Sequence, residues 1–240
     1  MTKEHGGNGK KKQAVVAEPT PEELSEFAYK PTVIDGLNEN KPFGSTSYKY
    51  MKGLLMHRVS PARYVHSLSV AKTARKLARV YGYDPHQARM AGLLHDWDKA
   101  LKPNRLADRV RDFNLDVSDE VIQNMPWVLH GITAAAVLKQ EAPQFGDDVF
   151  QAIGRHTVGA PDMTPLDMIV FIADKIEPTH DVAVYKQLYK QMGEISLQDL
   201  FFAVMKEGMA YLIRAEKPMN PDSVSVWNWY IQARSNNKGE

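Results

Sequence analysis

The chain has 240 residues, of which 43% are hydrophobic, and this is enough apolar material for an ordinary globular core. Its 30 Lys and Arg and 29 Asp and Glu give a formal net charge of +1, so no chain-wide field favours nucleic acid or an anionic membrane as a partner. The lack of cysteine excludes disulfides, thiolate metal sites and a cysteine nucleophile, which leaves His and carboxylate side chains as candidate metal ligands.

The N-terminal part of the chain has the composition of an arm rather than of a core. Residues 1–19 lack aromatic side chains and are predicted to be disordered. Residues 20–28 open with a capping box, and a short helix there would have an apolar face made of Leu24, Phe27 and Ala28. Residues 31–48 are rich in Pro, Gly, Asn and Ser and are predicted to be a linker. The N-terminus has no apolar leader, and we expect a cytoplasmic protein.

Helix signals recur along the rest of the chain. N-caps, N1 prolines and apolar residues at helical spacing predict helices that begin after Ser60, Asp84, Ser118 and Thr164, with a shorter piece around Leu106–Val110. Further helices are predicted over 128–140, over 147–153 with Asp147 as the cap, over 197–213 and over 224–233. No segment longer than four residues shows clean strand alternation, and no Asn-Gly or Asp-Gly hairpin signal lies between β-branched runs. We therefore expect an all-α helical bundle over residues 50–235, preceded by an N-terminal extension over 1–49.

Four of the eight histidines lie in or beside strongly apolar helices, and two aspartates accompany them: the six residues are His66, His95, Asp96, His130, His156 and Asp174. One buried imidazole is more often a core residue with a hydrogen-bond partner than a metal ligand. Four of them on different predicted helices are harder to explain separately, and one metal site would satisfy them together. Imidazoles and carboxylates without thiolate suit iron, manganese, cobalt or zinc.

The sequence contains two His-Asp dipeptides, and such a pair is a weak signal by itself. His95-Asp96 differs from His180-Asp181 because an apolar helix, Ala91-Gly92-Leu93-Leu94, leads into it. Adjacent residues of a helix diverge by about 100°, so His95 and Asp96 could address two metals or bridge them. We interpret His180-Asp181 as a chance pair.

In this order the six residues resemble the HD-domain metal-dependent phosphohydrolases. More narrowly, the motifs are similar to those of the bacterial HD-domain symmetrical bis(5'-nucleosyl)-tetraphosphatases over roughly residues 50–235. The resemblance rests on Arg63-Tyr64-Val65-His66-Ser67-Leu68, Ala91-Gly92-Leu93-Leu94-His95-Asp96 with Lys99, His130-Gly131, His156-Thr157-x-Gly159 and Ile172-Ala173-Asp174-Lys175-Ile176-Glu177-Pro178.

This resemblance implies a binuclear site, usually of iron, that splits diadenosine tetraphosphate into two ADP. It makes His66, His95, Asp96 and Asp174 ligands of one metal and His130 and His156 ligands of the second, with Asp96 as the bridge. Two cations can activate a water and neutralise charge on phosphate oxygens, so no protein nucleophile is required. Asp96 and Lys99 are then the catalytic candidates, and a small-molecule nucleotide is the expected partner.

The substrate candidates are Arg63, Lys99, Thr157, Gly159 and Lys175, and each has a structural alternative. Lys99 and Lys175 are as readily explained as solvated charges near helix ends. Arg63 lies one turn before His66, which favours a functional role, although a salt bridge would explain it too. Thr157 could be a helix cap and Gly159 a turn residue.

Two positions depart from the family pattern. Val158 stands where a second threonine is usual, and Thr179-His180-Asp181 follows Glu177-Pro178 where an arginine is usual. The second departure either removes a substrate-binding or interface cation or replaces it with His180. Neither position is one of the six proposed ligands.

Other functions compete with the leading one. The same metal site could act on a deoxynucleotide, an alarmone or a cyclic dinucleotide, but the Gly-Tyr-Pro signature of cyclic dinucleotide phosphodiesterases and the acidic doublet of alarmone hydrolases are absent. A non-catalytic HD binding module would be expected to have lost a ligand position, and all six are present. A homodimer is compatible with the sequence, and no residue requires it.

Overall fold

A computed structural model describes residues 32–236, so the disordered segment predicted over 1–19 and the short helix predicted over 20–28 lie outside the described residues. Residues 32–236 contain helices and no β-strand, which confirms the predicted all-α fold. The α-helices are α2 (Ser45–Arg58), α3 (Pro61–Tyr81), α4 (Pro85–Leu94), α5 (Pro103–Asp112), α6 (Asp119–Asn124), α7 (His130–Glu141), α8 (Asp147–Arg155), α9 (Pro165–Ile176), α10 (Ala183–Lys190), α11 (Leu197–Arg214) and α12 (Pro221–Asn236).

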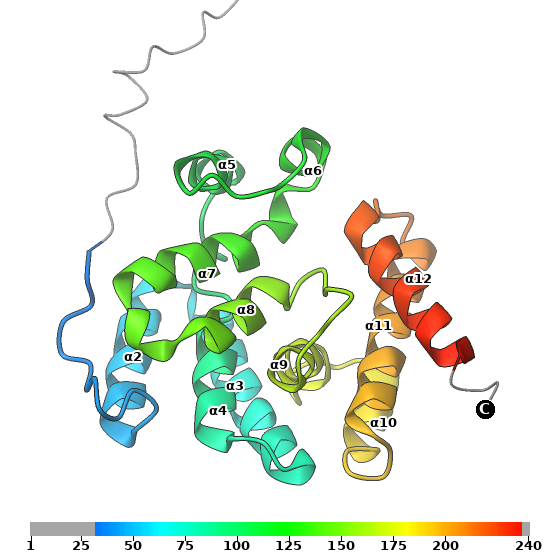
Figure 1. Cartoon of the computed structure of the whole chain (residues 1–240), viewed down its shortest axis with the longest axis horizontal. Helices are drawn as coiled ribbons and strands as arrows, with labels where there is room; N and C mark the ends of the chain where they lie inside the picture. Colours follow the sequence, from blue (N-terminus) through cyan, green and yellow to red (C-terminus); the bar gives the residue numbers. More distant parts are fainter. Residues whose placement is uncertain (1–31, 237–240) are drawn as a thin grey trace, which may run out of the picture.

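Two helix pairs and one central helix organise the bundle. Helices α3 and α4 pack along each other, and α7 and α8 form a second pair. Helix α9 lies between these pairs and the C-terminal helices, where it contacts α3, α4, α8, α10 and α11 (Figure 1). Short 3-10 helices at Pro126–Val128 and Pro143–Phe145 precede α7 and α8.

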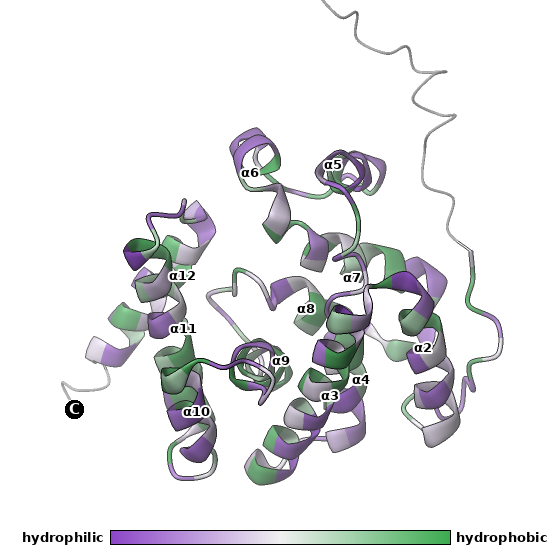
Figure 2. Cartoon of the chain, turned by 180° about the vertical axis from the view of Figure 1, so that it is seen from behind, coloured by the Kyte–Doolittle hydropathy of each residue, from purple (hydrophilic) through white to green (hydrophobic). Residues whose placement is uncertain are grey.

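Helix α9 is central because its sequence is apolar on all sides, as expected for a helix surrounded by others. Met168, Ile169, Val170, Phe171 and Ile172 are all buried, and Figure 2 shows mainly hydrophobic colouring around its circumference. The predicted Thr164 cap is confirmed: the Thr164 hydroxyl accepts from the Asp167 N–H, and the Asp167 carboxylate accepts from the Thr164 N–H. Helix α9 therefore starts at a fixed residue, which sets the position of Asp174 about two and a half turns later.

The apolar side chains form two large clusters, and α3, α4 and α9 contribute to both. One cluster joins these helices to α2, α7 and α8, and the other joins them to α10, α11 and α12. A smaller third cluster holds α5, α6 and the segment before α7 together. Within residues 32–236, no helix combines the length and the apolar character that a membrane span requires.

The sequence-based helix assignment differs from the structure at five places, one of which is the helix predicted over 224–233, which spans Pro221–Asn236. Residues 45–48 were predicted to be linker, but α2 begins at Ser45, and Tyr48 is buried in the core. Asp147 is the first residue of α8 rather than its cap, because Gly146 stands at the cap position. The helix predicted from residue 128 begins at His130, and α10 was not predicted. The domain boundary after residue 49 stays a prediction, and α2 crosses it.

Candidate metal centre

The structure brings the six predicted ligand side chains into one buried cluster. His66 projects from α3, His95 and Asp96 follow the last turn of α4, His130 begins α7, His156 follows α8, and Asp174 lies in α9. Each of the six residues is at most 9% exposed. Their ligand atoms form three overlapping groups compatible with metal binding: His66-His95-Asp96, Asp96-His130-His156 and His95-His156-Asp174.

Asp96 lies at the centre of this cluster, and its two carboxylate oxygens face different imidazoles. Its Oδ2 is 3.4 Å from His95 Nε2 and 3.8 Å from His66 Nε2. Its Oδ1 is 2.9 Å from His130 Nε2 and 3.8 Å from His156 Nε2. One carboxylate therefore joins two sets of nitrogens, an arrangement that suits a bridging ligand.

Backbone carbonyls set the orientation of three imidazoles. The Nδ1–H groups of His95, His130 and His156 donate to the carbonyl oxygens three residues earlier, over 2.9, 2.8 and 2.7 Å. A neutral imidazole that donates through Nδ1 has a lone pair on Nε2, and second-shell bonds of this kind orient metal-ligating histidines. The three Nε2 lone pairs consequently face the centre of the cluster.

Among the described residues, the Nε2 atoms of His95 and His156 have no donor, and His130 Nε2 has only the distant Lys99 ammonium at 3.5 Å, which tests whether the cluster fits a metal. His130 Nε2 and His156 Nε2 lie 3.1 Å apart, although both are acceptors in this tautomer. His95 Nε2 is buried and has no hydrogen-bond partner. Such an atom costs about 1–3 kcal/mol unless a donor or cation satisfies it. Nitrogen and carboxylate ligands suit a divalent transition metal, so the cluster fits one, and the assignment of each ligand stays a prediction.

The electrostatics of the cluster favour positive charge at its centre. Burial alone would lower the pKa of His95, yet the Asp96 and Asp174 carboxylates raise it to about 10, so without a cation this imidazole carries on Nε2 a proton that a bound metal would replace. The pKa values of Asp96 and Asp174 are held well below the usual range by neighbouring cationic groups, against the effect of burial. Burial lowers the pKa of His130 and His156, which favours the neutral form that a metal ligand requires.

Three predicted substrate residues surround the cluster with positive charge. Arg63 Nη1 donates to Asp96 Oδ2 over 2.9 Å, so this guanidinium is bound to the central carboxylate. Lys175 forms an ion pair with Asp174. The Lys99 ammonium lies within 3.5 Å of both ring nitrogens of His130, and burial lowers its pKa. That Arg63, Lys99 and Lys175 contact the substrate stays a prediction.

The other two substrate candidates have structural roles in the turn after α8. The Thr157 hydroxyl donates to the Val128 carbonyl over 3.3 Å, which ties this turn to the start of α7. Gly159 has a φ of +86°, a left-handed conformation that favours glycine. Thr157 borders two cavities, whereas Gly159 borders only the larger of these two.

An apolar cavity of about 500 Å³ is lined by Lys175 and His180, which contact Asp174 and His66 of the cluster. Its lining also includes Thr157 and the aromatic side chains Trp127, Phe171, Tyr185 and Tyr211. Ligand sites of small molecules are concave and mainly apolar with a few polar groups, and this cavity has that character.

Sequence reasoning gave Glu177 no role at the site, and it considered His180 only as a replacement for the arginine that is usual in the family. Glu177 is 1% exposed, and its Oε1 accepts from His66 Nδ1 over 3.0 Å. The His180 ring stacks on the His66 ring with centroids 5.2 Å apart, so the interpretation of His180-Asp181 as a pair unrelated to the site is wrong for His180. The spacing was an available signal, because Glu177 follows Asp174 by three residues, nearly one helical turn.

Comparisons with known proteins agree with this site. Residues 63–179 match the family model described as "HD domain". A Staphylococcus aureus protein named "Bis(5'-nucleosyl)-tetraphosphatase, symmetrical" is 30% identical over 180 residues, which are 75% of this chain and 92% of the relative. A Bacillus subtilis protein of the same name is 27% identical over 169 residues, covering 70% of this chain and 89% of the relative.

A solved structure is similar as well. The "predicted HD superfamily hydrolase involved in NAD metabolism" from Clostridium acetobutylicum superposes with a TM-score of 0.72 and 31% identity, over 79% of this chain and all of the other. The sequence matches and the shared fold confirm the predicted resemblance. The chain belongs to the HD-domain family of hydrolases and is a relative of the symmetrical bis(5'-nucleosyl)-tetraphosphatases.

Proposed function

We propose that this HD-domain phosphohydrolase hydrolyses dinucleoside polyphosphates at a binuclear metal site, with diadenosine tetraphosphate and water giving two ADP. The observation that carries the proposal is the position of Asp96, whose two oxygens each face a separate group of imidazoles. The names of the relatives support the choice of substrate.

The ligand assignment follows the two oxygens of Asp96. His66, His95, Asp96 and Asp174 would hold one cation, while Asp96, His130 and His156 would hold the other. Iron is the first candidate, and manganese, cobalt and zinc suit the same donors. Two such cations supply an acidified water and neutralise charge on the phosphate oxygens.

The surrounding cations of the protein bind and orient the polyphosphate. Arg63, Lys99 and Lys175 place three positive charges around the cluster, and charge-assisted hydrogen bonds from such groups to phosphate oxygens are strong. Burial lowers the pKa of Lys99, which eases proton transfer from its ammonium to the leaving phosphate.

The cavity beside the cluster accommodates one nucleoside. Its volume of about 500 Å³ lies within the range for small-molecule sites, and its lining includes the aromatic side chains Trp127, Tyr185 and Tyr211, on which a base could stack. Lys175 lies at the boundary between this cavity and the cluster, where a phosphate attached to the nucleoside would meet it.

A substrate panel tests the proposal. Purified protein is incubated with diadenosine tetraphosphate, a deoxynucleoside monophosphate, a deoxynucleoside triphosphate, an alarmone and a cyclic dinucleotide, and the products are separated by anion exchange. We expect diadenosine tetraphosphate to be the preferred substrate and ADP to be its only product. Release of ATP plus AMP, or preference for any other member of the panel, would contradict the assignment.

Two variants show whether the activity belongs to the cluster. We expect His95→Ala and Asp96→Ala each to lose at least a hundredfold in kcat while circular dichroism shows that the helices remain. His57→Ala is the matched control, because His57 is an exposed histidine near the end of α2. Retained hydrolysis in the cluster variants would place the activity elsewhere.

A further inference from the structure

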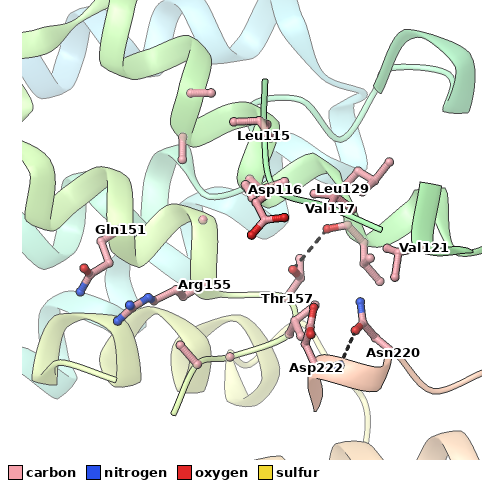
Figure 3. A pocket seen from close by; sticks show the side chains of 18 of the residues that line it. Leu115, Asp116, Val117, Val121, Leu129, Gln151, Arg155, Thr157, Asn220 and Asp222 are labelled. Carbon is pink, nitrogen blue, oxygen red and sulfur yellow. Dashed lines mark hydrogen bonds between the residues drawn. The ribbon is translucent and has the colours of Figure 1, made fainter. Parts of the chain in front are cut away.

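A second and larger cavity, of about 1070 Å³, is a groove along α7 and α8. Figure 3 shows its walls: Gln151 and Arg155 extend from α8 on one side, and Asn220 and Asp222 lie at the start of α12 on another. The segment before α6, which carries Leu115 and Val117, completes the groove. None of the six proposed metal ligands lines it.

The groove runs over the faces of α7 and α8 that point away from the metal centre. On α7 the groove is lined by Ile132, Ala135, Ala136 and Lys139. These residues follow His130 by two, five, six and nine positions, so their side chains are rotated about the helix axis by about 140–240° from that of His130. On α8 the groove is lined by Phe150 and Gly154 rather than by His156. The groove therefore lies outside the metal cluster, although it meets the smaller cavity at Val128, Thr157 and Asn220.

The floor of the groove is apolar and incompletely covered. Ile132, Ala135 and Ala136 are half-buried, although they lie in the middle of a core helix. They continue into Val128 and Leu115, which are apolar as well. A contiguous apolar surface of this kind generally indicates a binding partner.

The path of the chain brings its own N-terminal segment to this groove. The Ile34 N–H donates to the Glu141 carbonyl over 2.7 Å, which fixes the chain at the last residue of α7. Lys139 and Gln140, in the same turn of α7, line the end of the groove. The residues before 32 therefore join the described part of the chain at the mouth of the groove.

The sequence of this segment matches the groove in length and character. The helix predicted over 20–28 has Leu24, Phe27 and Ala28 on one face and Glu22 and Glu26 on the other. Nine helical residues span about 14 Å, and the α7 stretch from Ile132 to Gln140 spans about 12 Å. The seven residues from Phe27 to Ile34 can reach about 23 Å, which is more than the distance along α7 requires.

We propose that residues 20–29 bind in this groove, with Leu24 and Phe27 against Ile132 and Ala136 and the glutamates toward water. The occupant is a segment of the same chain because the Ile34–Glu141 hydrogen bond holds its attachment at the mouth of the groove. This binding does not depend on the proposed reaction. It would cover the outer face of α7, which begins with His130, and of α8, which ends just before His156.

Because the chain has no cysteine, engineered disulfides test the proposal in the full-length protein. The test pair is Phe27→Cys with Ala136→Cys, and the matched control pair is Phe27→Cys with Asp148→Cys. Asp148 is exposed at the start of α8, next to Asp147 of the groove, but does not line it. The chain between residue 27 and Ile34 is long enough for the cysteine at 27 to reach either partner, so only binding in the groove should make the two disulfides form at different rates.

We expect the intramolecular disulfide of the test pair, followed on non-reducing gels at low protein concentration, to form at least tenfold faster than that of the control pair. Leu24→Glu in the test pair should reduce this rate to that of the control. Equal rates in the two pairs would overturn the proposal. Faster formation of disulfide-linked dimers in the test pair would also overturn it, since the occupant would then come from a second copy.

Discussion

Glu177 is the buried carboxylate that orients His66. Its Oε1 lies 3.0 Å from His66 Nδ1, and the Thr179 N–H donates to its Oε2 over 2.7 Å. A carboxylate that accepts from the outer nitrogen of a histidine fixes the tautomer and raises the basicity of the inner nitrogen. His66 therefore presents Nε2 to Asp174 and Asp96, both of which lie on that side.

Replacing Glu177 by glutamine tests this role. We expect Glu177→Gln to weaken metal affinity about 10- to 100-fold, because the amide can still hydrogen-bond but no longer carries the charge that polarises His66. The measurement is competition with a chelator of known affinity. Glu194→Gln, at an exposed glutamate, is the control and should leave the affinity unchanged. Equal affinities in the two variants would show that Glu177 does not act through His66.

The same carboxylate predicts a pH dependence of stability. Burial opposes its charge, but hydrogen bonds from His66, Ser69 and Thr179 lower the pKa of Glu177 from 4.5 to about 2. Because the folded pKa is the lower one, the carboxylate stabilises the fold above pH 4.5, and this contribution is lost as the pH falls toward 2.

Urea unfolding in the presence of chelator measures this contribution. The free energy of unfolding of wild type should exceed that of Glu177→Gln at pH 7 by at most about 3 kcal/mol, and the difference should shrink at pH 3. A difference that stays constant between the two pH values would contradict the assigned pKa.

The proposed ligands could be found from the sequence because each lies in or beside an apolar helix, where an imidazole or carboxylate is conspicuous. Glu177 and His180 could not be found in this way, because they follow the end of α9 at Glu177-Pro178, where polar residues are common. Only the folded chain shows that Glu177 points back to His66 on α3 and that the rings of His66 and His180 stack.

At the scale of elements, the close approach of α7 and α8 positions His156. A Cβ added at Gly131 would lie 3.1 Å from the Cε1 and Nδ1 atoms of the His156 ring and 3.1 Å from the Ile153 carbonyl oxygen. The same carbonyl accepts from His156 Nδ1. Glycine at position 131 therefore leaves space for an imidazole held between the two helices.

Gly131→Ala should displace the His156 ring. We expect at least a tenfold loss of kcat and a loss of about 1–3 kcal/mol in stability, which is the usual cost of overpacking. Gly53→Ala is the matched control, because a Cβ at this α2 position meets nothing within 4 Å and alanine favours the helix by about 1 kcal/mol. Full activity in Gly131→Ala would show that the ring position is not critical.

The helices that sequence analysis predicted well have side-chain caps. The Ser60, Asp84, Ser118, Thr164 and Ser196 side chains accept from backbone N–H groups at the starts of α3, α4, α6, α9 and α11. In contrast, Gly44 and Val182 precede α2 and α10 without such a bond, so packing rather than a local signal fixes these helices. The error at Asp147 has the same cause, because Gly146 precedes α8.

At the scale of the whole molecule, the cluster joins parts of the chain that are far apart in sequence. His66 and Asp174 lie 108 positions apart, and their side chains approach within 3.0 Å. A cation held by ligands from several helices binds only the folded chain, so it should stabilise the fold. The family resemblance implied that these residues share a site, but spacing along the chain alone does not specify where the helices meet.

Chelation should therefore lower the melting temperature. We expect removal of metal to reduce Tm by at least about 5 °C, since a tightly bound ligand contributes several kcal/mol and each kcal/mol corresponds to about 2–4 °C in a protein of this size. Differential scanning calorimetry with and without chelator measures the change, and returning manganese or ferrous iron should restore it. An unchanged Tm would show that no metal is coupled to folding.

Metal stoichiometry tests the central claim most directly. The account predicts two transition-metal ions per chain in the purified protein by elemental analysis, and close to none in Asp96→Ala, because this residue is the proposed link between the two ions. His57→Ala should retain both ions. A metal-free wild-type protein that still hydrolyses its substrate, or an Asp96→Ala protein that retains both ions, would contradict the account.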